Sequence, residues 1–333
     1  MRPSLLAETI KAHHAIKRAM LIEGAPGIGK SAVPKQVAAE LGIGFGLINV
    51  PLKLQDDYGM PVINQDRTEI RFVVPEECIP FEGSDRWEDE GIFVVDELSG
   101  AGNNEQKVWS GIIQDRVLHG RPIKPGWTFV ATGNRTKDRA GANRILSMLA
   151  NRMNRYTFEP NLDDWCRWAL ANDVDPMVVS FLRFKPGLLA AFDPNQDSNP
   201  TPRAWSEGVS PFIGKLPKEA QFETFMGAVG EGAAAEFTAF LATCLKMPNP
   251  DAILLTPDTA EVPTEPSILY AVSGAIAQRA SKASFDRIMT YAKRLPPEFM
   301  VLAVRDSMVK DKSVVQTKSF TEWACKEGAN VMM

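Results

Sequence analysis

The sequence predicts an α/β protein with a doubly wound parallel sheet in its first 160 residues and helices in the remainder. Apolar runs such as residues 91–95 and 128–132 alternate with segments of helical spacing up to residue 158. Unbroken apolar runs of this length are typical of strands that are covered on both faces. After Pro160 only helical patterns and turn-rich stretches follow. This order of elements favours an α/β domain followed by an all-helical part.

The expected domain boundaries follow this change of pattern. Residues 1–160 are assigned to the α/β core and residues 161–246 to a helical lid. Residues 247–266 contain five prolines and are predicted to be a linker. Residues 267–333 return to helical patterning and are predicted to form a C-terminal helical extension. Within the lid, helices are expected at 162–172, 176–184, 203–213 and 217–245.

The elements of the core are expected in a regular order. Helical spacing marks residues 5–18, and the apolar residues 19–22 predict a strand directly after them. Two short strands at 61–63 and 69–74 are predicted on either side of the turn Asn64–Arg67. The other expected elements are a helix at 31–41, a strand at 45–50, a strand at 91–95, a helix at 103–115, a hairpin at 117–127 and a strand at 128–132.

A complete phosphate-binding motif connects the first strand to the helix that follows it. Its residues are Gly24-Ala25-Pro26-Gly27-Ile28-Gly29-Lys30-Ser31. The strand–loop–helix context is the one that this motif requires, because the glycines let backbone N–H groups surround an anion at a helix N-terminus. Lys30 can reach the β- and γ-phosphates, and the Ser31 hydroxyl can bind Mg²⁺. The chain is therefore predicted to bind a nucleoside triphosphate.

Polar residues follow two of the predicted core strands. Asp96 and Glu97 end the apolar strand at 91–95, and Asn134 follows the strand at 128–132. We expect Asp96 to hold Mg²⁺ through water, and Glu97 to orient or deprotonate the attacking water. The Asn134 amide could bridge Glu97 and the γ-phosphate through that water. These residues predict hydrolysis in addition to binding.

The composition narrows the class of protein. The formal net charge is −4, which gives no general attraction to nucleic acid or to an anionic membrane. No apolar stretch approaches the ~20 residues of a membrane-spanning helix, and the N-terminus lacks the apolar segment of a signal peptide. The four cysteines are scattered without metal-binding spacing. We therefore expect a cytoplasmic protein that makes no membrane contact.

These motifs together resemble those of the AAA+ ATPases, and within them the MoxR-like branch that includes CbbQ and NirQ. Gly24–Ser31 is similar to Walker A, Phe93–Glu97 to Walker B and Asn134 to sensor 1. Tyr58–Pro75 resembles the insert of this branch, and Arg116–Gly126 resembles its hairpin before sensor 1. The resemblance covers about residues 5–245 and implies ATP as the nucleotide.

The resemblance also suggests arginines that sense or stabilise the γ-phosphate. Arg152 corresponds to the finger that acts on the ATP of an adjacent subunit, and we expect it to lack a target in its own subunit; Arg144 and Arg155 are alternatives. Arg203 corresponds to sensor 2. It follows the predicted N-cap Thr201 by two residues, so its charge opposes the helix dipole unless a phosphate neutralises it.

Three functions are compatible with this sequence. The resemblance implies a ring, of six subunits in this family, that remodels a protein partner with a von Willebrand factor A domain. A nucleic-acid motor is an alternative, because the predicted hairpin Arg116–Lys124 is locally basic and could contact DNA phosphates. A small-molecule kinase would need no arginine from a neighbouring subunit, and the Asp96-Glu97 pair disfavours it.

Overall fold

The computed structural model describes residues 1–135 and 143–326 of the chain. It divides into two compact units, Met1–Pro160 and Asn161–Met333, and each is described here by itself. The end of the expected C-terminal extension, residues 327–333, lies outside the described residues. No described helix is long and apolar enough to cross a lipid bilayer.

The first unit is built on a five-stranded parallel sheet in the order β2-β5-β8-β1-β9, which confirms the predicted α/β class. The central strands are almost entirely buried, as their apolar sequences predict. The fifth strand, β9, was not expected. Its residues are mostly exposed and polar, because it pairs with β1 on one side only and lies at the sheet edge. The strands are β1 (Met20–Glu23), β2 (Gly44–Asn49), β5 (Glu90–Asp96), β8 (Gly126–Gly133) and β9 (Asn154–Thr157).

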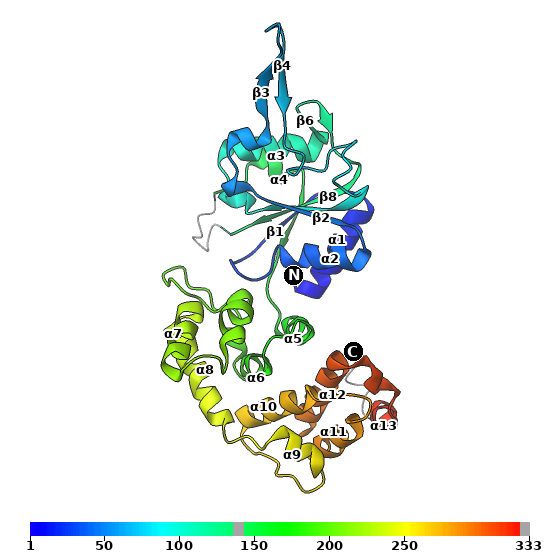
Figure 1. Cartoon of the computed structure of the whole chain (residues 1–333), viewed down its shortest axis with the longest axis vertical. Coiled ribbons are helices and arrows are strands. Elements are labelled where there is room, and N and C mark those ends of the chain that lie inside the picture. Colours follow the sequence, from blue (N-terminus) through cyan, green and yellow to red (C-terminus); the bar gives the residue numbers. More distant parts are fainter. Residues whose placement is uncertain (136–142, 327–333) are drawn as a thin grey trace. The chain divides into compact units, whose positions relative to one another are not determined.

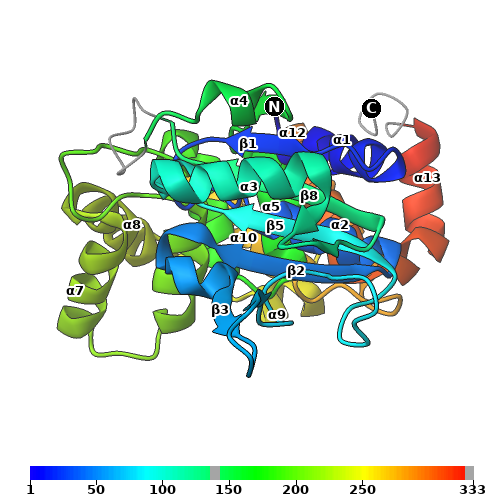
Figure 2. The same cartoon turned by 90° about the horizontal axis from the view of Figure 1, so that it is seen from above.

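Helices cover both faces of this sheet. Figure 1 shows α1 (Pro3–Ala15) and α2 (Ala32–Leu41) on one face, with α3 (Asn103–Asp115) and α4 (Ser147–Ala150) on the other. In the view from above, α3 lies over β5 and β8 (Figure 2). Its buried face packs onto an aromatic core, in which the rings of Trp109, Phe93 and Phe129 lie within 6.1 Å of one another.

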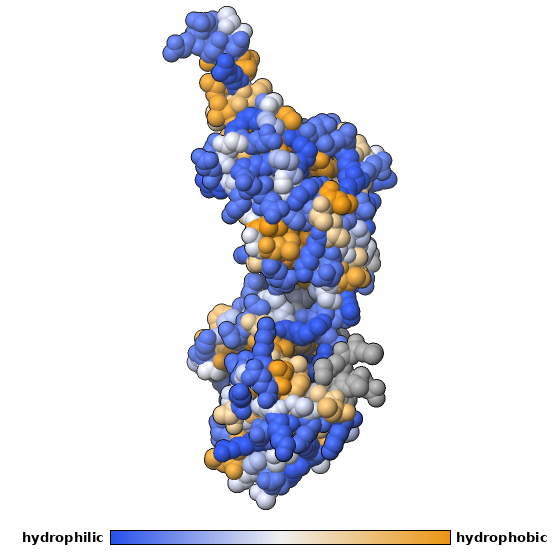
Figure 3. All heavy atoms as spheres, turned by 90° about the vertical axis from the view of Figure 1, so that its right-hand side faces the viewer, coloured by the Kyte–Doolittle hydropathy of each residue, from blue (hydrophilic) through white to orange (hydrophobic). Residues whose placement is uncertain are grey.

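Two small hairpins interrupt the core, as predicted. The first joins β3 (Met60–Ile63) to β4 (Ile70–Val73) and projects away from the sheet (Figure 1). Hydrophobic atoms lie along its stem and hydrophilic atoms at its tip (Figure 3). The second joins β6 (Val117–Leu118) to β7 (Arg121–Pro122). Short 3₁₀ turns complete the unit at η1 (Val50–Leu52), η2 (Gln55–Tyr58) and η3 (Leu98–Gly100).

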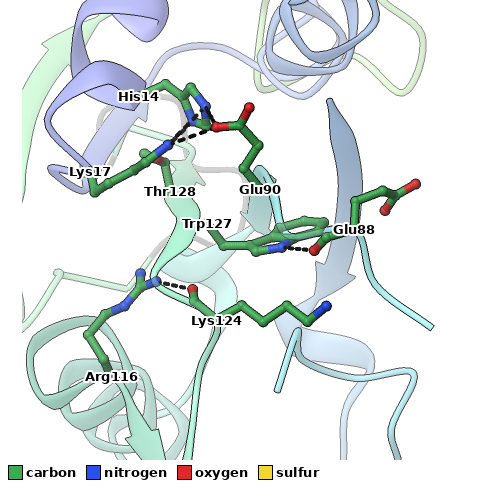
Figure 4. A network of polar contacts seen from close by, with 8 residues as sticks. All are labelled: His14, Lys17, Glu88, Glu90, Arg116, Lys124, Trp127 and Thr128. Carbon is green, nitrogen blue, oxygen red and sulfur yellow. Dashed lines mark hydrogen bonds and ion pairs between the residues drawn. The ribbon is translucent and has the colours of Figure 1, made fainter. Parts of the chain in front are cut away.

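A polar network closes the end of the sheet at which β5 and β8 begin (Figure 4). His14 Nδ1 lies 3.1 Å from Thr128 Oγ1, and His14 Nε2 lies 3.1 Å from Lys17 Nζ. Glu90 pairs with Lys17 at 3.5 Å. Burial lowers the pKa of His14, and the charge of Lys17 lowers it further, against the opposing effect of Glu90. A neutral His14 therefore joins α1 to the sheet.

Residues 161–326 of the second unit form helices and connecting loops without a strand, and they differ from expectation in detail. The stretch expected as one helix at 217–245 is divided at Gly230, whose φ of 81° breaks the helical path. The expected linker contains helix α9, whose N-cap Asn249 accepts a hydrogen bond from the Asp251 N–H. The α-helices of the second unit are α5 (Leu162–Ala171), α6 (Pro176–Phe184), α7 (Lys218–Val229), α8 (Glu231–Cys244), α9 (Pro250–Leu255), α10 (Pro266–Ala277), α11 (Phe285–Ala292), α12 (Pro297–Lys310) and α13 (Lys318–Lys326). Short helical turns lie at η5 (Pro186–Leu188), η6 (Ala204–Val209, a π-helix), η7 (Ser210–Phe212) and η8 (Lys312–Gln316).

Helix α10 is the centre of the second unit and is buried along nearly its whole length. It packs against α6 and α12, and the Ser180 hydroxyl of α6 donates to the Tyr270 carbonyl of α10 at 3.2 Å. Arg183 of α6 forms two hydrogen bonds with Asp306 of α12, at 2.6 and 2.7 Å. Helices on either side of the expected linker are therefore packed into one body.

Candidate nucleotide-binding site

The phosphate-binding loop lies between β1 and α2, as its sequence predicts. Gly27 and Gly29 have φ values of 72° and 98°, a region that strongly favours glycine. Gly24 has no room for a side chain, because a Cβ there would lie 2.8 Å from the Phe158 carbonyl oxygen. Pro34 lies in the first turn of α2, where a missing N–H removes no helical hydrogen bond. The loop thus presents backbone groups at a helix N-terminus, where an anion is favoured.

Lys30 is buried at the centre of the site. Its ammonium group donates to the carbonyl oxygens of Gly24 and Ala25, at 3.0 and 2.8 Å, and to Asn134 Oδ1 at 2.9 Å. The last contact joins the loop after β1 to the end of β8. The structure therefore brings Lys30 and Asn134 together, although 104 residues separate them in sequence.

Ser31 and Asp96 lie side by side. The Ser31 hydroxyl donates to Asp96 Oδ1 at 2.5 Å, and the Thr132 hydroxyl donates to the same oxygen at 2.5 Å. A hydroxyl and a carboxylate fit Mg²⁺, which commonly takes one or two protein oxygens and completes its shell with water and substrate phosphates. Among residues 1–135 and 143–326, no cluster of three His, Cys, Asp or Glu is arranged to hold a metal.

Glu97 has a left-handed backbone conformation, with φ 55° and ψ 35°. Such a conformation is unfavourable for a residue with a side chain and costs about 1–3 kcal/mol. Its N–H donates to the Thr132 hydroxyl at 3.0 Å, and its exposed carboxylate follows directly after Asp96. A strained residue that is held in place in this way is common at functional sites.

The arginines are placed differently from one another. Arg152 donates to the carbonyl and hydroxyl oxygens of Ser110 on α3, so its guanidinium has a partner in its own chain, and its assignment as the finger stays a prediction. Arg155 lies on β9 and forms a bidentate pair with Glu23 at 2.9 Å. Arg144 is exposed and has no hydrogen bond or ion pair within the described part of the chain.

Arg203 belongs to the second unit, and its role as sensor 2 stays a prediction. The expected N-cap is confirmed, because Thr201 Oγ1 accepts a hydrogen bond from the Ala204 N–H at 3.1 Å. The Arg203 side chain is exposed in the first turn after this cap. The Arg203 cation therefore lies at the N-terminal end of a helical turn, where the helix dipole disfavours a positive charge, as expected.

Two residues at the site were not expected from the sequence. Thr132 contacts both Asp96 and Glu97, and the Ser99 hydroxyl accepts a hydrogen bond from the Asn134 N–H at 2.8 Å. Thr132 had a signal, because it is the polar last residue of the predicted strand at 128–132, and ligands bind at the C-terminal ends of such strands. Ser99 follows Glu97 in an irregular turn, and no pattern in the sequence indicates its contact.

Comparison with known proteins gives distant similarities. No protein-family model matches the chain, and no curated protein matches it. A solved structure of NtrX from Brucella abortus in complex with ADP is 13% identical over 98% of this chain and 68% of that chain, with a TM-score of 0.39. A RuvB mutant from Thermotoga maritima is 14% identical over 81% of this chain and 80% of that chain, with a TM-score of 0.40. At this level neither structure assigns an activity.

The fold itself is an α/β core with a phosphate-binding loop, followed by helices. Its sheet has the order β2-β5-β8-β1-β9, and the phosphate-binding loop leaves the C-terminal end of β1. The neighbouring strands β5 and β8 deliver Asp96 and Asn134 to the same edge. In open α/β sheets this edge is where ligands bind.

Proposed function

We propose that this chain is a magnesium-dependent ATPase of the AAA+ type. The observation that carries this proposal is the convergence of Lys30, Ser31, Asp96 and Asn134 at one edge of the sheet, where Lys30 donates to Asn134 and Ser31 donates to Asp96. A protein that only binds a nucleotide would need the phosphate-binding loop alone. The additional strained Glu97, directly after Asp96, supports hydrolysis.

Each residue has a defined task in this proposal. Lys30 binds the β- and γ-phosphates and neutralises their charge. Ser31 and Asp96 hold Mg²⁺, which contributes positive charge at the phosphates when it is bound. Glu97 accepts a proton from the attacking water, and Asn134 orients that water toward the γ-phosphate.

Replacing Glu97 with glutamine tests the catalytic assignment. The amide keeps the size of the side chain but cannot accept the proton, so we expect kcat for ATP hydrolysis to fall at least about 100-fold. ATP affinity, measured by equilibrium titration, should stay within about threefold, because Glu97 does not hold the phosphates. Glu82→Gln is the matched control, since Glu82 is exposed on the same unit. Turnover by Glu97→Gln at the wild-type rate would exclude Glu97 as the base.

We further propose a ring, of six subunits by the family resemblance, in which an arginine completes the ATP site of the neighbouring subunit. Arg152 is engaged by Ser110, whereas Arg144 is exposed and makes no hydrogen bond or ion pair with residues 1–135 or 143–326 of its own chain. The segment that carries Arg144 is fixed to the site, because the Asn143 N–H donates to the Ser99 carbonyl at 2.6 Å. Arg144 is therefore our preferred finger, in place of Arg152.

Subunit mixing distinguishes these arginines. Arg144→Ala should lower ATP hydrolysis at least about 100-fold without changing the melting temperature, because a finger acts only on transition-state charge. Mixing Arg144→Ala subunits with Lys30→Ala subunits should restore part of the activity, since some interfaces then combine an intact loop with an intact arginine. Arg152→Ala should instead lower the melting temperature, because it leaves Ser110 unpaired. Restoration by Arg152→Ala but not by Arg144→Ala would return the role to Arg152.

The partner is proposed from the family resemblance: a protein with a von Willebrand factor A domain, remodelled by the ring. In this proposal Arg203 senses the γ-phosphate, and the exposed guanidinium at a capped helical turn supports a phosphate ligand.

The DNA-motor alternative is weaker, because the basic residues of the β6–β7 hairpin have partners. Arg116 donates to the Lys124 carbonyl at 2.7 Å, Lys124 pairs with Asp89, and Arg121 lies over the Phe81 ring.

A further inference from the structure

Two buried side-chain hydroxyls form hydrogen bonds between the ends of β5 and β8. Thr132 on β8 accepts the Glu97 N–H at 3.0 Å, and Ser99, which follows β5, accepts the Asn134 N–H at 2.8 Å. Each strand end is therefore held by a side chain of the other. Thr132 and Ser99 are 0% and 2% exposed, so water cannot replace either hydroxyl without entering the core.

These two hydrogen bonds lie just beyond the last residue pair of β5 and β8. The pairing of β5 with β8 ends at Val95 and Ala131, one residue before Asp96 and Thr132. Among the described residues, no further β5–β8 pair follows that point. Near Asp96, Glu97 and Asn134, the Thr132 and Ser99 hydroxyls connect the ends of the two strands.

The packing leaves little freedom in this arrangement. A Cβ at Gly133 would lie 3.2 Å from both the Cβ and the Oγ of Ser99, so β8 approaches the turn after β5 closely. Thr132 also donates its hydroxyl proton to Asp96 Oδ1, at 2.5 Å, while it accepts from Glu97. One hydroxyl thus fixes both the carboxylate of Asp96 and the backbone of Glu97. The left-handed conformation of Glu97 needs such support, because it is intrinsically unfavourable.

We propose that Thr132 and Ser99 are positioning residues of the ATPase site. Thr132 sets the orientation of Asp96 and the backbone of Glu97, and Ser99 sets the position of Asn134. Neither touches the nucleotide. This inference rests on the ATPase function proposed above. Residues that orient a ligand or catalytic group in this way typically contribute about 10- to 100-fold to activity or metal affinity.

Amide hydrogen exchange of the nucleotide-free protein tests the contacts without any activity. Thr132→Val keeps the side-chain shape and removes the hydroxyl, so exchange of the Glu97 amide should accelerate at least about tenfold. Thr132→Ser restores the hydroxyl and should return the wild-type rate. Ser99→Ala should accelerate exchange at Asn134 and leave Glu97 unchanged. Thr128→Val is the matched control, because Thr128 is buried on the same strand at the opposite end of the sheet.

Kinetics then test the functional consequence. Thr132→Val should lower kcat for ATP about 10- to 100-fold with ATP affinity within about threefold, and Thr132→Ser should recover most of it. Thr128→Val should hydrolyse ATP at the wild-type rate. Unchanged kcat in Thr132→Val, with or without faster exchange, would overturn the positioning role. Failure of the ATPase proposal looks different: the wild-type protein would hydrolyse no ATP, while the exchange results would still report on the hydroxyl contacts.

Discussion

Lys30→Ala is expected to abolish ATP binding at micromolar nucleotide. Lys30 is the buried cation of the phosphate-binding loop, and its ammonium group lies between the Gly24 and Ala25 carbonyls and Asn134. A hydrogen bond to a charged group contributes about 1.5–3 kcal/mol, and Lys30 can form several to phosphate oxygens. Loss of about 3 kcal/mol weakens affinity more than 100-fold. Equilibrium titration with a fluorescent ATP analogue measures the change.

Lys35→Ala is the matched control for this experiment. Lys35 is an exposed lysine on α2, the helix that follows the phosphate-binding loop, so its removal changes the net charge of the unit equally. It should leave ATP affinity unchanged within about twofold. Circular dichroism without nucleotide should show both variants folded. Equal affinities of Lys30→Ala and wild type would refute the nucleotide site, and with it the proposed ATPase.

Asp306→Ala is expected to destabilise the second unit by about 3–5 kcal/mol, because it leaves the Arg183 cation buried without its partner. Arg183 and Asp306 are 13% and 4% exposed, and they join α6 to α12. Burial lowers the pKa of Arg183, but the hydrogen bonds and charge of Asp306 more than reverse this, so the net pKa shift is upward. Denaturant unfolding of the full chain, followed by tryptophan fluorescence, should show a clearly lower midpoint.

An exposed pair of the same chemistry provides the control. Arg279 and Asp251 also pair through two nitrogens and two oxygens, but they are 35% and 68% exposed. Asp251→Ala should cost less than about 1 kcal/mol, because water screens the lost interaction. The double variant Arg183→Met/Asp306→Leu should recover much of the stability lost in Asp306→Ala, since it leaves no unpaired charge. Equal losses in Asp306→Ala and Asp251→Ala would show that burial of the pair does not matter.

The hydrogen bonds that join α6 to α12 within the second unit have a consequence for the proposed ring. Residues before and after the expected linker share one packed body, with Ser180 and Arg183 both bonded across it. Any movement of the Arg203 region on ATP binding would therefore carry the C-terminal helices with it.

The sequence by itself determined the features whose cause is local. Gly24–Ser31 identifies the loop because the required backbone conformations and the phosphate-binding side chains lie within eight consecutive residues. The strands β5 and β8 were predictable because burial on both faces demands an unbroken apolar run. Asp96, Glu97 and Asn134 followed from these strands, since parallel strands end at a common edge of the sheet.

Only the tertiary structure decided the features that depend on partners distant in sequence. The edge strand β9 carries no apolar run, because one of its sides has no neighbour. The partner of Arg152 is 42 residues away, and Arg183 and Asp306 are 123 residues apart. The place of Thr132 at a strand end is visible in the sequence, but its contact with Glu97, and that of Ser99 with Asn134, form only where β5 and β8 lie side by side in the fold. Local patterns record the conformation and burial that each segment requires, whereas the pairing of side chains across the fold is settled only when the whole chain has packed.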